Sequence, residues 1–96
     1  MSTINVGFQV LPFTKEDNMY ELVDKAIEVV QESGVKYEVG PLETVMEGEL
    51  DHLIDIVKKA QQACLDAGAE SVITNVKIIN VPKGTTIEDK IGKYRA

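Results

Sequence analysis

Residues 37–49, near the middle of the chain, read YEVGPLETVMEGE. Strand-forming residues stand on both sides of Gly40-Pro41, a pair typical of turns, so the segment predicts two short strands folded into a hairpin. The segment ends in a Glu-Gly pair, just where an apolar pattern with helical spacing begins. Such a junction places a carboxylate and exposed backbone amides beside a sheet edge, where a small polar ligand can be held.

The elements around the hairpin follow from the spacing of their apolar residues. Apolar residues that alternate with polar ones predict strands, and apolar residues spaced three to four positions apart predict helices. The expected strands are 4–13, 35–39, 43–47 and 71–81, and the expected helices are about 19–33 and 50–67.

Capping and breaking residues set the ends of these elements. Asn18 with Glu21 predicts a capped start for the first helix, and Gly34 and Gly68 predict the two helix ends. Pro12 has no amide hydrogen and should end the ladder of the first strand. A short tail helix is expected after Pro82.

The order of these elements predicts one domain, residues 1–96, of class α+β. Strand, helix and strand occur twice, which is typical of the ferredoxin-like β-α-β-β-α-β sandwich with an antiparallel sheet. Both helices should cover one face of that sheet. The short C-terminal helix would be an addition to it.

The sheet face without helices should be only partly polar. We expect Leu11, Met46 and Ile79 on this face, with Gln9, Thr44 and Asn75 as its polar groups. A fully solvated face is usually more polar, so a second subunit is expected to cover it. The alternative is an ordinary amphipathic face, because scattered apolar residues are common on surfaces.

Composition excludes several classes of partner. The 96 residues carry a formal net charge of −6, which disfavours nucleic acid. No apolar run is long enough to span a bilayer, and no signal peptide pattern precedes the first strand, so we expect a cytoplasmic protein without a membrane partner. One cysteine, Cys64, rules out an internal disulfide.

Three segments together carry a resemblance to a known family. They are GFQVLP at residues 7–12, YEVGP at 37–41 and TVMEGELD at 44–51. In these the chain resembles the YkoF-like thiamine- or hydroxymethylpyrimidine-binding protein family. The resemblance implies a ferredoxin-like fold, a homotetramer associated through its sheets, thiamine or hydroxymethylpyrimidine as ligand, and no known catalysis.

Six residues are candidates for binding such a ligand: Gln9, Tyr37, Thr44, Glu47, Gly48 and Asn75. The carboxylate of Glu47 could pair with the thiazolium or accept from the pyrimidine amino group. The polar side chains could hydrogen-bond the ring, Tyr37 could stack on it, and Gly48 could let it approach the backbone. Each also has a structural alternative, such as a strand former, a turn residue or a charge at a helix start.

Catalysis and metal binding are not expected. Glu38, Glu43, Glu47 and Glu49 form an acidic cluster in sequence, but adjacent strand residues point to opposite faces. His52 is interpreted as a surface residue and Cys64 as a small core residue. We therefore expect a non-enzymatic carrier or sensor in thiamine metabolism, without a cofactor. The alternative is a self-associating regulatory or assembly module that has no thiamine ligand.

Overall fold

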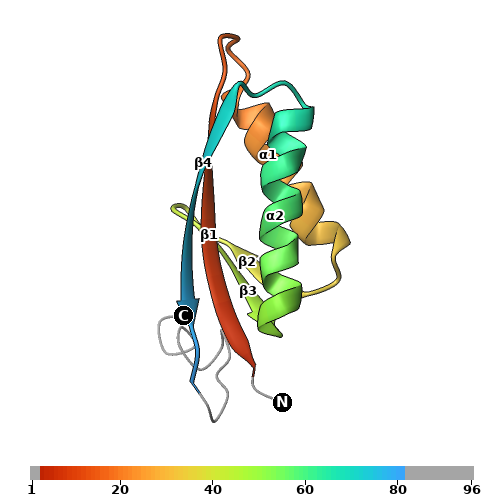
Figure 1. Ribbon diagram of the computed structural model, residues 1–96, viewed down its shortest axis with the longest axis vertical. Helices are drawn as coiled ribbons and strands as arrows, with labels where there is room; N and C mark the ends of the chain where they lie inside the picture. Colours follow the sequence, from red (N-terminus) through yellow and green to blue (C-terminus); the bar gives the residue numbers. More distant parts are fainter. Residues whose placement is uncertain (1–2, 82–96) are drawn as a thin grey trace.

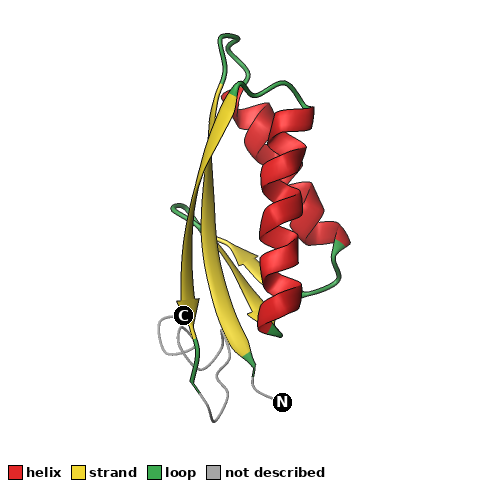
Figure 2. Cartoon of the chain, in the orientation of Figure 1, coloured by secondary structure: helices red, strands yellow, loops and turns green. Residues whose placement is uncertain are grey.

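The computed structural model describes residues 3–81 and contains one four-stranded antiparallel sheet with two helices on one side (Figure 1). Figure 2 shows the two layers separately coloured. In chain order the elements are β1 (Ile4–Phe13), α1 (Met19–Glu32), β2 (Lys36–Val39), β3 (Thr44–Gly48), α2 (Leu50–Asp66) and β4 (Ser71–Ile79). The sheet order is β2-β3-β1-β4, which is compatible with the ferredoxin-like sandwich. The predicted tail helix lies outside the described residues.

The core lies between the sheet and the two helices. Alternate residues of β1 enter it, and α1 and α2 contribute their apolar stripes. Its fully buried large side chains are Leu22, Met46, Leu53, Val6, Val30 and Cys64. Neither of the two helices is long and apolar enough to cross a membrane.

The register of β3 corrects the predicted sheet faces. Met46 pairs with Val6 and Thr44 pairs with Phe8, so all four side chains face the helices. The prediction that Met46 and Thr44 lie on the open face was therefore wrong. The open face instead carries Val45 and Glu47 from this strand, because neighbouring strand residues alternate sides.

Glycines end both helices as predicted, whereas the capping prediction was wrong. Gly34 has a φ of 81° and Gly68 a φ of 114°, the left-handed region in which glycine is least strained. Asn18 stands before α1 but its side chain makes no capping hydrogen bond. Its Oδ1 instead accepts a hydrogen bond of 3.0 Å from the Thr14 hydroxyl, so it stabilises the preceding loop.

Pro12 does not end β1, which continues to Phe13 and pairs with β4 over its whole second half. The reason lies in the unequal lengths of the neighbouring strands. β3 pairs with β1 only as far as Phe8, so Pro12 lies where β1 has a single strand neighbour within the described residues. Proline is tolerated at such edge positions.

Cys64 is a core residue, as predicted. Its side chain is fully buried, and its Sγ donates a hydrogen bond of 3.3 Å to the carbonyl of Leu22. Burial raises the pKa of the Cys64 thiol above its ordinary value of 9.0.

We expect Cys64 to react with a thiol reagent on the order of a hundredfold more slowly in the folded protein than in denaturant, because labelling requires opening of the core. Because folding raises the pKa of this thiol, its neutral form contributes to the stability of the folded state at pH values below the unfolded pKa. This contribution is lost as the pH rises through the folded pKa. Absorbance during labelling with a chromogenic disulfide measures both effects. Rapid labelling of the native protein would contradict this burial.

Candidate functional site

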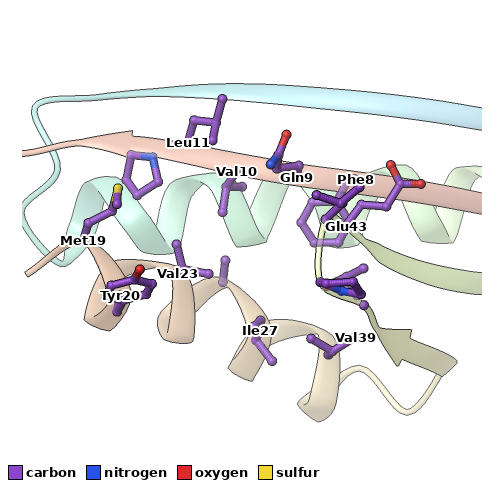
Figure 3. Close-up of a pocket in the computed structure, with 16 residues that line it drawn as sticks. Phe8, Gln9, Val10, Leu11, Met19, Tyr20, Val23, Ile27, Val39 and Glu43 are labelled. Atoms are coloured by element: carbon purple, nitrogen blue, oxygen red, sulfur yellow. The ribbon is translucent and has the colours of Figure 1, made fainter.

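A pocket lies between α1, the second half of β1 and the β2–β3 turn (Figure 3). Its volume is about 260 Å³. Apolar side chains form most of its walls, with Phe8 and Val10 from the sheet facing Val23 and Ile27 from the helix. The pocket exists because β1 extends beyond the end of β3, which leaves a gap that the hairpin turn closes only in part.

Two polar residues, Thr44 and Glu43, border the hairpin end of this pocket. Thr44 is buried on the helix side of the sheet, and its hydroxyl can both donate and accept a hydrogen bond. Glu43 lines the rim, but its side chain extends over β1, where its carboxylate lies beside Gly7 and Lys77 on the open face (Figure 3). The exposed edge of β1 adds backbone groups, because alternate residues of an edge strand direct N–H and C=O away from the sheet.

The position of Glu43 depends on a glycine in the neighbouring strand. A Cβ atom at Gly7 would lie only 2.7 Å from Oε1 of Glu43, so a larger residue there would displace the carboxylate. The same carboxylate forms an ion pair with Lys77 of β4, with Oε2 at 3.1 Å from Nζ. Glu43 thus crosses β1 at Gly7 and connects the pocket rim to the open face.

The open face carries three of the predicted site residues. Gln9 and Asn75 lie opposite each other, and Nδ2 of Asn75 donates a hydrogen bond of 3.4 Å to Oε1 of Gln9, so their predicted proximity is confirmed. Glu47 lies on the same face and its Oε2 is 3.9 Å from Nζ of Lys36. Of these three residues, only Gln9 also lines the pocket.

Tyr37 and Gly48 lie on the helix side of the sheet. Tyr37 pairs with Met46 on the edge strand β2, and it is not among the residues that line the pocket. A Cβ at Gly48 would be 3.3 Å from Leu53, so this glycine lets α2 pack closely on the sheet. The structure therefore brings Thr44 and the Gln9 segment together at the pocket and leaves Tyr37, Glu47, Gly48 and Asn75 away from it.

Sequence reasoning missed the contribution of α1 and of Glu43. The apolar spacing that includes Val23 and Ile27 was used only to predict a helix over about 19–33, and Glu43 was considered only as one member of an acidic cluster. The available signal was the difference in length between the strands, since a ten-residue β1 cannot be covered by a five-residue β3.

The acidic residues of the hairpin do not converge on a metal site. Within residues 3–81 no group of three or more His, Cys, Asp or Glu side chains is arranged to hold a metal ion. Glu43 and Glu47 each lie beside a lysine instead.

The fold and the pocket together define an α+β domain with a small, mainly apolar pocket between its sheet and one helix. The sequence matches the profile of the family described as thiamine-binding protein over residues 6–95, and the chain belongs to this family. The predicted family resemblance is thus confirmed.

Several known proteins are similar to this chain. A UPF0045 protein of Clostridium perfringens is 50% identical over 95 residues, which cover 99% of this chain and 100% of that protein. A domain of unknown function from Bacillus cereus has a solved structure with a TM-score of 0.94 and 58% identity, covering 98% of this chain and 91% of that one. A Thermotoga maritima protein, provisionally assigned to thiamine biosynthesis or salvage, has a TM-score of 0.89 and 34% identity, covering 97% and 99% of the two chains.

Proposed function

We propose that this protein binds thiamine through its hydroxymethylpyrimidine half, or binds hydroxymethylpyrimidine itself, in the pocket between α1 and β1. The observation that supports this most is an apolar pocket that ends at Thr44 and Glu43 in a member of the thiamine-binding protein family. Apolar walls with a few well-placed polar groups are typical of small-molecule sites. The protein would act as a carrier or sensor without catalysis.

The size of the pocket favours the pyrimidine half of thiamine. Its volume of about 260 Å³ is below the range of about 300 to 1,000 Å³ that drug-sized ligands occupy. One substituted ring would fit between Val10 and Val23, with Thr44 bonding the ring edge. The thiazolium would then extend past Glu43 towards solvent, where the negative carboxylate would attract its positive charge.

The proposal predicts different roles for two glutamates of the same hairpin. Glu43→Gln should weaken binding of thiamine by about 10- to 100-fold. The reason is that a hydrogen bond or ion pair with a charged group contributes about 1.5 to 3 kcal/mol to binding. Glu47→Gln is the matched control, since Glu47 also lies beside a lysine but does not line the pocket, and should bind as the unsubstituted protein does. Calorimetry with thiamine and with hydroxymethylpyrimidine measures both.

The pattern across the two ligands separates the contacts of Glu43. Weakening of thiamine alone places the carboxylate at the thiazolium, whereas equal weakening of both places it at the pyrimidine amino group. Loss of binding in Glu47→Gln alone would move the site to the open face. If neither compound binds or raises the unfolding temperature at millimolar concentration, the thiamine proposal fails.

The second candidate function is a self-associating module without this ligand. It is favoured by the apolar residues that the open face exposes, of which Leu11, Phe13, Ile73 and Ile79 are the largest. We propose that a second sheet packs on this face, as part of a homotetramer. Binding and association are compatible, so the ligand experiment decides only between a binding protein and a module that binds itself alone.

A further inference from the structure

The strand β1 has a free backbone edge along one wall of the pocket. β3 pairs with β1 only as far as Phe8, whereas β4 pairs with it as far as Phe13. Within the part of the chain that the structure describes, residues 9–13 therefore have a strand partner on the β4 side alone. Residues 9–12 line the pocket, so its wall includes the backbone edge that β3 does not cover.

The hydrogen bonds at the ends of the strands determine which residues of β1 direct their backbone groups to this edge. The N–H of Gly40 donates to the carbonyl of Glu43 at 2.9 Å, so β3 directs its odd-numbered residues to β2 and its even-numbered residues to β1. The register pairs even-numbered residues of β3 with even-numbered residues of β1, so these residues of β1 face β3. The carbonyl of Phe13 agrees with this alternation, because it accepts a hydrogen bond of 2.8 Å from Glu70 on the β4 side.

Val10 supplies a donor and an acceptor to this open edge. Among residues 9–13, Val10 and Pro12 are even-numbered and so direct their backbone groups to it. Val10 presents its N–H and C=O close together, as in the closely spaced bonds of an antiparallel ladder, whereas Pro12 has no N–H. Val10 is 7% exposed, and backbone groups so far from water normally have a hydrogen-bond partner. A ligand in the pocket can provide that partner.

We propose that the backbone N–H and C=O of Val10 bind the edge of the aminopyrimidine ring. The N–H donates to the ring nitrogen beside the amino-bearing carbon, and the amino group donates to the C=O. These two ring groups are adjacent, one an acceptor and one a donor, so they match the two groups of Val10. Val23 and Ile27 of α1 face this part of the sheet and cover one face of the ring (Figure 3). This recognition depends on the function proposed above, and it identifies the chemical feature of the ligand that the pocket selects.

The pairing selects amino rings over oxo rings. In the 4-oxo counterpart of hydroxymethylpyrimidine the ring nitrogen carries a hydrogen and the oxygen accepts, so at Val10 donor faces donor and acceptor faces acceptor. Turning the ring over restores the pairing, but it exchanges the places of the methyl and hydroxymethyl groups in the pocket. Pro12 offers no second N–H on this edge. We therefore expect the oxo compound to bind about tenfold or more weakly in calorimetry, and equal binding of the two compounds would contradict this pairing.

An ester in place of one backbone amide tests the donor directly. Ligation of synthetic peptides can replace the N–H of Val10 by oxygen and leave every side chain unchanged. Binding of hydroxymethylpyrimidine should then weaken by about tenfold, because the ring nitrogen loses its donor. The matched control is the same ester at Gln9, whose N–H faces β4 where Gln9 pairs with Asn75. This control loses a bond of the ladder, so it should lower the unfolding temperature and keep the affinity.

A ring analogue identifies the atom that this N–H contacts. Replacing the ring nitrogen beside the amino-bearing carbon by C–H should weaken binding to the unsubstituted protein by about tenfold, and the ester at Val10 should then cause no further loss. Independent losses from the analogue and the ester would overturn the proposal, as would an ester at Val10 that binds hydroxymethylpyrimidine normally or equal losses in the two esters. In each of these cases hydroxymethylpyrimidine still binds the unsubstituted protein. If it does not bind, the function proposed above fails, and this recognition fails with it.

Discussion

Replacing Met46 by lysine is expected to unfold the domain. Met46 is fully buried between the sheet and the helices, and it faces Val6 in the register of β3 and β1. An unpaired ammonium group at this site costs several kcal/mol, and the loss of the buried methionine adds about 2 to 5 kcal/mol. Together these approach the whole stability of a domain, about 5 to 15 kcal/mol. Circular dichroism and denaturant unfolding measure the outcome.

Two further variants separate core burial from other effects. Met46→Leu keeps the volume and apolar character, so it should lose less than about 1.5 kcal/mol. Leu11→Lys places the same charge on the open face, where Leu11 is exposed, and should leave the domain folded. A folded Met46→Lys protein whose only defect is a lower oligomer mass would show that Met46 lies at an interface.

The position of Met46, predicted on the open face but found in the core, shows what the sequence alone can and cannot predict. The turn at Gly40-Pro41, the helix spacing and the strand alternation are local signals, and they predicted every described element to within about three residues. The face of β3 is not a local property. Thr44 and Met46 alternate with Val45 and Glu47, so both faces mix apolar and polar residues, and only pairing with Val6 and Phe8 decides between them.

The candidate site was predictable only in part for the same reason. Thr44 and the Gln9 segment belong to the resembling motifs, and both border the pocket. The placement of Glu43 requires knowledge that Gly7 lies in the neighbouring strand and leaves room for its carboxylate. The α1 wall requires the packing of a helix against a part of β1 that β3 does not reach. Such contacts join residues far apart in sequence, which periodicity does not relate.

Filling the pocket is expected to weaken ligand binding strongly without unfolding the protein. Val23 lies on α1 and is only partly buried, so a tryptophan at this position can extend into the space opposite Val10 without displacing the core. Val23→Trp should weaken binding of thiamine and hydroxymethylpyrimidine by more than tenfold, which corresponds to about 1.4 kcal/mol or more. Titration calorimetry measures this loss, and thermal unfolding without ligand shows that the fold persists.

The matched control is a valine on the same helix. Val29 is also partly buried and packs against the core, but it does not line the pocket. Val29→Trp therefore introduces the same side chain with a similar cost in packing, and it should bind both compounds as the unsubstituted protein does. Equal losses in the two variants would indicate a general effect on α1. Unchanged binding in Val23→Trp would place the ligand outside this pocket, because the indole and the ligand ring would compete for the same space between Val10 and position 23.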